Sequence, residues 1–178
     1  MPDTLEPDLL GRFVEGDHAA FEGLFRHYQA DVFRWIVRIV RDASASEDVL
    51  VETFWRAYRG RARFDPSRSF GAWMRRIATN AALDHLKAAR RRARWSAENA
   101  VAATAPVVPD PDVNEFITLA FRRLPPKLQI VAALALIEEQ PYAEIADALD
   151  VPIGTVKSRV FRATRALRKD LAALGIRP

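Results

Sequence analysis

The 178-residue sequence contains no cysteine and only three histidines, and these shortages exclude several kinds of site at once. Without cysteine there is no disulfide framework, no thiol nucleophile and no thiolate zinc site. His18, His27 and His85 are scattered along the chain, and none stands at a spacing typical of metal ligands. We therefore expect no metal, no cofactor and no catalytic residues.

Long apolar runs and strand patterns are also missing. No run of about 18 apolar residues is present, so we expect no membrane insertion. The acidic start, MPDTLEPDLL, lacks the basic end and apolar core of a signal peptide, which predicts a cytoplasmic protein. Hydrophobic residues make up 49% of the chain, enough to build a core. Helical periodicity without strand alternation predicts an all-α fold.

The positive charge is concentrated in two places, although the net charge is only +4. Residues 56–94 contain twelve Lys or Arg, opposed only by Asp65 and Asp84. Residues 155–178 contain seven, opposed only by Asp170. Each block alone could be a solvated face, but two of them on an otherwise acidic chain indicate two contacts with nucleic acid.

The segment 96–111, SAENAVAATAPVVPDP, divides the chain. It has no cation, three prolines and many small residues, a composition typical of a linker. We predict helical domains at 1–95 and 112–178 on either side. Sixteen extended residues span roughly 50 Å, which exceeds one turn of DNA at roughly 34 Å.

The second domain contains a predicted helix-turn-helix at 141–167. Apolar residues at helical spacing end at Leu149, and Asp150 then stands where the turn needs a left-handed residue. Pro152 precedes a second helix, whose inner face includes Val156 and Val160. An ordinary helical hairpin with a solvated basic face is the weaker alternative. The outer face of the second helix could read bases and grip phosphates through Thr155, Lys157, Ser158, Arg159 and Arg162.

The first domain carries an acidic helix and a basic helix joined by the loop 60–69. The acidic helix, 47–59, places Asp48 and Glu52 on one face, which either meets a basic partner or is simply solvated. The loop contains Phe64, an aromatic side chain that could stack on an unpaired base or be tucked into the core. The basic helix, 70–94, could lie along a phosphate backbone.

Three stretches together resemble the extracytoplasmic-function sigma factors, the two-domain specificity subunits of bacterial RNA polymerase. SEDVLVETFWRAY (46–58) is similar to the segment of that family that docks on the polymerase clamp. SFGAWMRRIATNAALDHLKAARRR (69–92) looks like its −10 recognition helix. LPPKLQIVAALALIEEQPYAEIADALDVPIGTVKSRVFRATRALRKDL (124–171) resembles its −35 recognition domain. Val51 and Asp150 depart from the family, which usually has Gln and Gly there.

The resemblance implies partners and a role for each site. The partners would be the clamp helices of core RNA polymerase, promoter DNA and, in many family members, an anti-sigma factor. Core polymerase would be bound by Asp48, Val49, Leu50, Glu52 and Phe54. The −10 element would be bound by Arg61, Arg63, Phe64, Arg75, Arg76 and Asn80. The −35 element would be read by the five residues of the second helix named above.

Two other functions remain open from the residues alone. A free-standing helix-turn-helix regulator would explain residues 142–167, but it leaves the first basic block and the acidic helix without a role. A metal-dependent nuclease could use Glu47, Asp48 and Glu52, because carboxylates sharing a helix face can hold a divalent cation. Binding of duplex DNA without polymerase would favour the former, and cation binding that requires Asp48 would favour the latter.

Overall fold

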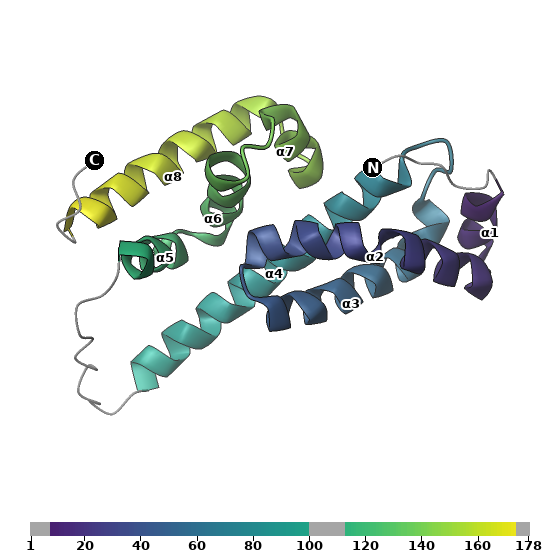
Figure 1. Ribbon diagram of the computed structural model, residues 1–178, viewed down its shortest axis with the longest axis horizontal. Helices are drawn as coiled ribbons and strands as arrows, with labels where there is room; N and C mark the ends of the chain where they lie inside the picture. The colour runs from purple at the N-terminus through teal and green to yellow at the C-terminus, as the bar shows by residue number, and fades with distance from the viewer. Residues whose placement is uncertain (1–7, 100–112, 174–178) are drawn as a thin grey trace.

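The computed structural model describes residues 8–99 and 113–173, and every regular element in them is helical, which confirms the predicted all-α fold. Figure 1 shows α1–α4 in one half of the molecule and α5–α8 in the other. In chain order the elements are α1 Leu9–Glu15, α2 His18–Val40, α3 Ala43–Gly60, the 3-10 turn η1 Arg61–Arg63, α4 Phe70–Asn99, α5 Val113–Arg123, α6 Pro126–Ala132, the π-helical turn η2 Ala133–Ile137, α7 Tyr142–Leu149 and α8 Ile153–Ala173.

Helices α2, α3 and α4 form a bundle, and α1 closes one end of it. An aromatic cluster centred on the buried Phe70 ties the first turn of α4 to its neighbours. The Phe70 ring lies 5.5 Å from Phe13 of α1, 5.1 Å from Tyr28 of α2 and 5.3 Å from Phe64 of the loop, measured between centroids. The loop after α3 is therefore anchored to the bundle through Phe64.

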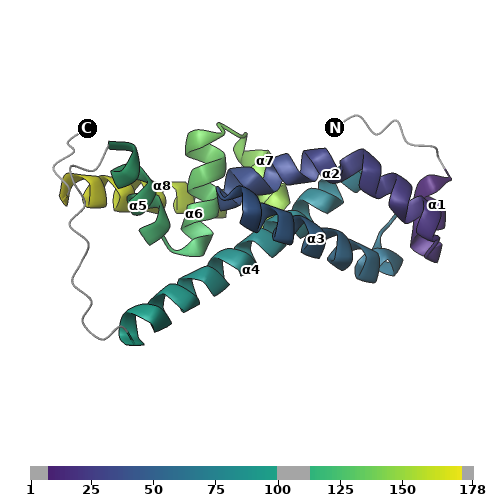
Figure 2. The ribbon, with the colours of Figure 1, turned by 60° about the horizontal axis from the view of Figure 1, so that its bottom comes forward.

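Helix α4 runs five residues beyond the Arg94 end that the sequence predicted. It continues to Asn99, four residues into the predicted linker, and its exposed last turns project past α3 (Figure 2). Ala, Glu and Ser in this stretch tolerate a helix, and the first proline follows only at Pro106. The remainder of the predicted linker lies outside the described residues.

Helix α6 starts at a proline and ends in a π-helical turn. Pro126 occupies the first turn, where its missing N–H costs nothing. The α-helical pattern ends at Ala132 because the Glu138 N–H bonds five residues back to the Ala133 carbonyl, at 3.1 Å. Glu139 then adopts a positive φ of 49°, and the chain continues from there to α7.

Helices α7 and α8 form the predicted helix-turn-helix. Asp150 has a φ of 53°, the left-handed conformation that its position required. The Val151 N–H reaches back to the Ala146 carbonyl at 3.1 Å and closes the end of α7. Val156 of α8 is fully buried and fixes the packing of the two helices.

One buried cluster runs from the first half of the molecule into the second. It contains Met74 and Leu86 of α4 together with Ile130 and Leu134 from α6 and η2 and Ile145 of α7. Helix α4 packs against both α6 and α7, and α2 packs against η2. The two halves therefore share apolar packing, and a second, smaller buried cluster that includes Leu124 and Leu167 lies within the second half.

Candidate protein and nucleic-acid interfaces

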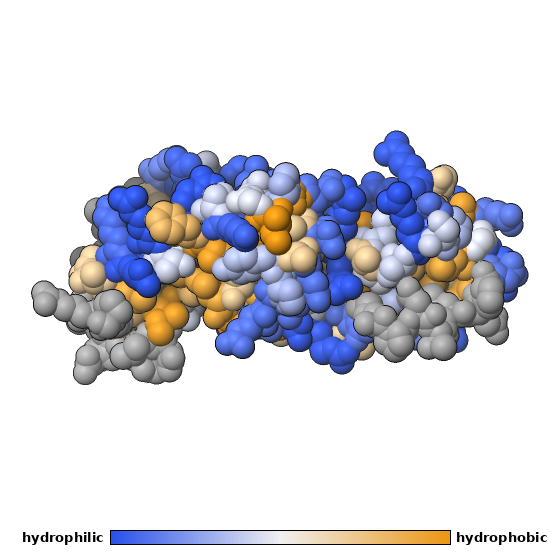
Figure 3. Space-filling model, turned by 90° about the horizontal axis from the view of Figure 1, so that it is seen from above, coloured by the Kyte–Doolittle hydropathy of each residue, from blue (hydrophilic) through white to orange (hydrophobic). Residues whose placement is uncertain are grey.

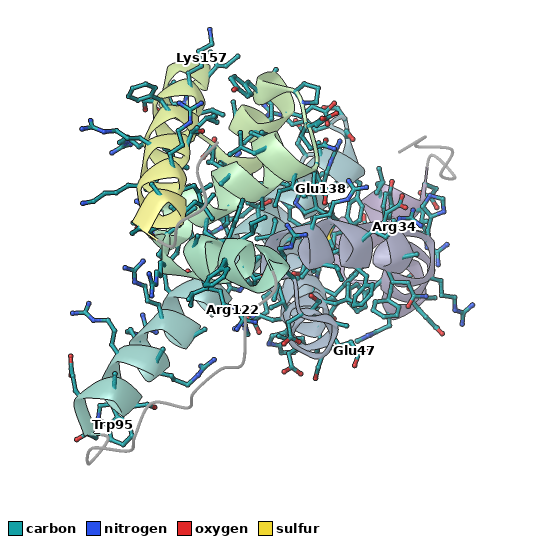
Figure 4. The ribbon with its side chains drawn as sticks, turned by 60° about the vertical axis from the view of Figure 1, so that its left-hand side comes forward. Arg34, Glu47, Trp95, Arg122, Glu138 and Lys157 are labelled. Atoms are coloured by element: carbon teal, nitrogen blue, oxygen red, sulfur yellow. The ribbon has the colours of Figure 1, made fainter. Side chains whose placement is uncertain are left out.

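The outer face of α3 combines carboxylates with exposed apolar side chains. Asp48 and Glu52 lie on it, and so do Val51 and Trp55, which are 68% and 53% exposed. These positions are three, four and seven residues from Asp48, so they share one face of the helix. Figure 4 shows Glu47, at the start of this surface, pointing away from the second half of the molecule. An exposed apolar pair beside carboxylates is typical of a protein-docking surface.

Glu52 is held in place by cations of its own half. Its Oε1 accepts from Arg56 Nε at 2.7 Å and lies 3.8 Å from Arg59. Arg56 also donates to Asp84 of α4 at 2.9 Å. The hydrogen bond to Glu52 raises the pKa of Arg56 above its ordinary value, and the bond to Asp84 adds to this. Burial opposes ionisation of Asp84, but the bonds from Arg56 and Lys87 outweigh it and lower the pKa of Asp84.

Two of the predicted docking residues face inward. Val49 and Phe54 are buried between α2, α3 and α4, and the Phe54 ring lies 4.7 Å from Phe25. Leu50 is half-buried. The helix face that carries them builds the bundle, so their contribution to docking is to position α3. Sequence reasoning passed over Val51 and Trp55 as contacts, although their spacing from Asp48 placed them on its face.

Some of the residues predicted to contact DNA in the loop after α3 are exposed, and others are turned inward. Arg63 is exposed. Phe64 is buried against Phe70 and Trp73, so its ring is not available for stacking on a base. Arg61 is also turned inward. Its Nη1 donates to the Tyr58 carbonyl at 2.9 Å, its guanidinium carbon lies 4.4 Å from the centroid of the Tyr58 ring, and its Nε is buried.

The basic face of α4 is directed toward the helix-turn-helix. Arg75 lies over the Trp35 ring, 5.8 Å from its centroid, and its Nη1 is 3.4 Å from Glu144 of α7. Arg76 forms an ion pair with Asp150 in the turn. Asn80, one turn further along α4, is exposed. Among the predicted −10 residues, Arg75 and Arg76 thus have carboxylate partners in the other half of the molecule.

A groove of about 820 Å³ opens between the two halves at this contact. Arg63, Arg75 and Arg76 line one side, and Glu144 and Asp150 line the other. The groove is therefore basic on the α4 side and acidic on the α7 side.

The outer face of α8 is largely exposed. Lys157, Ser158 and Arg162 are exposed, while Thr155 and Arg159 are half-buried. Lys157 points outward at the end of the helix in Figure 4. The structure brings all five predicted residues to one helix end, together with Phe161, which is 69% exposed. Sequence reasoning missed Phe161, although it lies four residues after Lys157 on the same face.

The surface shown in Figure 3 is mainly hydrophilic, with small apolar patches between charged side chains. Within the described residues no helix is long and apolar enough to cross a membrane. Those residues also contain no cluster of three His, Asp or Glu side chains arranged to hold a metal ion.

Comparison with known proteins identifies the family. The chain is 34% identical to the RNA polymerase sigma-H factor of Pseudomonas aeruginosa over 187 residues, covering 96% of this chain and 97% of that protein. Residues 24–92 match the model of sigma-70 region 2, and residues 117–167 match that of sigma-70 region 4. The chain belongs to the sigma-70 family of RNA polymerase sigma factors.

Other similar proteins agree with this sigma-factor assignment. The chain is 30% identical to the extracytoplasmic-function sigma factor SigW of Bacillus subtilis, covering 90% of this chain and 93% of that protein. A solved structure of CnrH in complex with the cytosolic domain of CnrY has a TM-score of 0.57 at 23% identity, covering 94% of this chain and 97% of that one. The sigma factor RpoE of Bartonella quintana, solved in complex with the anti-sigma factor NepR, has a TM-score of 0.53 at 21% identity, covering 85% of this chain and 96% of that one. The two structures establish the likeness of fold.

The matched regions contain all the surfaces described above. Region 2 of this sigma factor spans α3 and the basic face of α4, and region 4 spans the helix-turn-helix. Sigma factors are non-catalytic initiation factors that bind core RNA polymerase and direct promoter recognition and transcription initiation. The function of this chain is therefore to direct promoter recognition by that enzyme.

Proposed function

We propose that this sigma factor divides its work among three surfaces. The outer face of α3 docks on the clamp helices of core polymerase, the basic face of α4 holds the −10 element, and α8 reads the −35 element. The domain limits are 1–95, 96–111 for the linker and 112–178. The observation that carries the proposal is that three chemically distinct surfaces lie on three different helices of the two matched regions.

The docking surface consists of Asp48 and Glu52 with the exposed Val51 and Trp55 beside them. Its carboxylates suit a basic partner, and Trp is among the residues that contribute most to binding at interfaces. Val49, Leu50 and Phe54 support this surface from behind. The position that the family usually fills with Gln is apolar here, so docking relies more on burial of apolar area and less on a polar contact.

The −10 surface consists of Arg63, Arg75, Arg76 and Asn80. Three cations and an amide can neutralise phosphates and hydrogen-bond an unpaired base. Because the protein supplies no chemical energy, strand opening would depend on this capture of unpaired bases. Arg61 and Phe64 give the loop its shape, because both are packed against the bundle. The loop must rearrange if the Phe64 ring is to reach a base.

The −35 surface is the exposed end of α8. Arg159 and Arg162 can donate to guanine or phosphate, Thr155 and Ser158 can donate to or accept from bases, and Lys157 neutralises phosphate. Phe161 adds an apolar contact of the kind that meets thymine methyl groups. This sigma factor acts in the cytoplasm without catalytic residues or cofactors, and we expect a partner of the anti-sigma type to control it.

Transcription by purified bacterial core polymerase on genomic fragments, with and without this protein, tests the proposal. We expect new start sites that require the protein and share two upstream elements. The result that would overturn it is a core enzyme that neither binds the protein nor initiates, while the protein alone protects duplex DNA. A free-standing regulator would then be the correct description.

A further inference from the structure

Among residues 8–99 and 113–173, three ion pairs join the two halves, and in each the cation comes from the first half and the carboxylate from the second. Arg76 pairs with Asp150, Arg75 Nη1 lies 3.4 Å from Glu144 Oε2, and Arg38 Nε lies 3.1 Å from Glu138 Oε2. The residues of the first two pairs line the groove between α4 and α7. Such a consistent direction of charge indicates complementary faces.

The carboxylates of Glu144 and Asp150 form ion pairs with cations that would otherwise bind DNA. Arg75 and Arg76 belong to the proposed −10 surface. We call the arrangement in which α7 packs on α4 the closed arrangement, and in it their side chains are 31% and 48% exposed. A carboxylate and a phosphate present similar oxygen acceptors to a guanidinium. Glu144 and Asp150 therefore stand where backbone phosphates would otherwise bind.

The closure covers one of the three proposed surfaces and leaves two open. Val51 and Trp55 on α3 are exposed, and so are Lys157 and Phe161 on α8. In Figure 1, α3 and α8 lie on opposite sides of the contact between α4 and α7. The closed protein can thus present its docking and −35 surfaces while its −10 surface is engaged.

In the closed arrangement the two proposed DNA-binding surfaces also lie too close together to reach both promoter elements. Elements centred near −10 and −35 lie more than two helical turns apart, roughly 80 Å on B-DNA. Helix α7 packs directly on α4, so the two DNA-binding surfaces cannot reach elements at that separation. Promoter binding therefore requires the ion pairs to break.

Resting on the proposed function, we propose that Glu144 and Asp150 form an intramolecular latch that mimics DNA phosphates, masks Arg75 and Arg76 in the free protein and is displaced when the promoter is bound. The backbone turn by itself would be satisfied by Gly or Asn, which tolerate a positive φ better than Asp. The carboxylate at position 150 has a second role, which is to pair with Arg76.

The absence of cysteine makes the latch directly measurable. We would place spin labels at Ala30→Cys on α2 and Ala172→Cys on α8, two exposed positions outside the three surfaces. Double electron–electron resonance should give one short, narrow distance at low salt. The unlatched variant, Glu144→Gln with Asp150→Asn, should show a longer and broader component, because Asn keeps the turn and removes the charge.

The expected size of the effect follows from the exposure of the pairs. Each exposed ion pair changes such an equilibrium by about two- to fivefold, so the open fraction should rise severalfold. Raising the salt to 1 M shortens the screening length from about 10 Å to about 3 Å and should open the wild-type protein similarly. Asp147→Asn is the matched control, since Asp147 lines the groove and, within the described residues, pairs with neither Arg75 nor Arg76.

A binding measurement without polymerase provides the second readout. The unlatched variant should bind a fluorescent oligothymidine of about 12 nucleotides severalfold more tightly than wild type. Identical distance distributions for wild type and the unlatched variant at every salt would overturn the latch. Loss of the sigma role would show instead as failure to initiate with core polymerase, and the spin-label distances would still decide the latch.

Discussion

At the residue scale, Thr79 links the core of region 2 to the basic face of α4. The buried Trp35 Nε1–H donates to Thr79 Oγ1 at 2.9 Å, and that hydroxyl donates to the Arg75 carbonyl at 2.7 Å. Thr79→Val should lower the free energy of unfolding by about 1–3 kcal/mol, because it leaves the indole N–H buried without a partner. Urea denaturation measures this, and Thr79→Ser is the control that keeps the hydroxyl. Equal losses in both variants would contradict the hydrogen-bond explanation.

Asp17 gives the first half of the molecule a pH-dependent contact at the start of α2. Its carboxylate accepts from Arg12 Nε at 2.7 Å and from the N–H groups of Ala19 and Ala20. The Arg12 bond is the largest cause that lowers the pKa of Asp17, followed by those two N–H groups. A carboxyl group whose pKa is lower in the folded than in the unfolded protein stabilises the fold at pH above its ordinary pKa. This stabilisation is lost as the pH falls through the lowered pKa.

Asp17→Asn should therefore lower the melting temperature at neutral pH, with the difference from wild type shrinking at strongly acidic pH. Asn caps a helix about as well as Asp but cannot pair with Arg12 as an anion. Circular dichroism melts across a pH series measure the difference. A difference that stays constant at acidic pH would show that the charge of Asp17 contributes nothing.

Individual residues were predictable where the backbone dictates them. The left-handed conformation of Asp150 followed from a local rule and is confirmed. Arg61 and Phe64 were different, because an irregular loop carries no periodicity to say which side chains turn inward. Val49 and Phe54 were named as docking residues from a resemblance, and both side chains are buried.

At the scale of elements, α3 offers a test of polymerase docking. Asp48→Arg should weaken binding to core polymerase about tenfold or more, since it places a cation on a face proposed to meet a basic partner. Surface plasmon resonance with immobilised core measures this, and an unchanged circular dichroism spectrum shows that the fold is kept. Glu22→Arg, an equal change of charge on the exposed side of α2, should leave binding unaltered. Unchanged binding by Asp48→Arg would remove α3 from the interface.

Helix α8 offers the corresponding test for DNA. Arg159→Ala should cost about 1–3 kcal/mol in binding to the −35 element while leaving core binding intact, as expected for one base-reading side chain. Competition between duplexes with and without the element measures this. Lys169→Ala, which removes an exposed cation far along the same helix, is the control. Equal weakening by both variants on every duplex would indicate general phosphate attraction only.

Elements were predictable in kind but less so in extent. Helix α3 begins at Ala43 and not at Glu47, because Asp42 accepts from the Ala45 N–H at 2.9 Å and caps it earlier. The change to a π-helical turn at Ala133 depends on where backbone N–H groups find acceptors. Apolar spacing over a single turn does not distinguish that from an α-helix.

At the scale of the whole molecule, the packing of one half on the other was not predictable. Two domains and a linker were expected, yet Met74 of α4 and Ile145 of α7 belong to one buried cluster. Each helix pattern identifies an apolar face but not the partner that covers it. Glu144 of α7 and Asp150 of the following turn could likewise be read as solvated until Arg75 and Arg76 were found opposite them.

The shared cluster predicts that the two halves unfold together. All four tryptophans, Trp35, Trp55, Trp73 and Trp95, lie in the first half, so tryptophan fluorescence reports on that half alone. Leu134 lies in the second half and is fully buried. Leu134→Ala should remove about 2–5 kcal/mol of stability and, because the cluster is continuous, shift the fluorescence-monitored transition together with the circular dichroism transition.

The control comes from the same π-helical turn. Leu136 is 42% exposed, so Leu136→Ala should leave both transitions nearly unchanged. If Leu134→Ala moved the circular dichroism transition and left the fluorescence transition in place, the halves would be independent in solution. A joint shift that vanishes in the Glu144→Gln, Asp150→Asn background would instead show that the latch is what couples them. The apolar contact between α4 and α7 would then be too weak to hold the two regions together once their charges are removed.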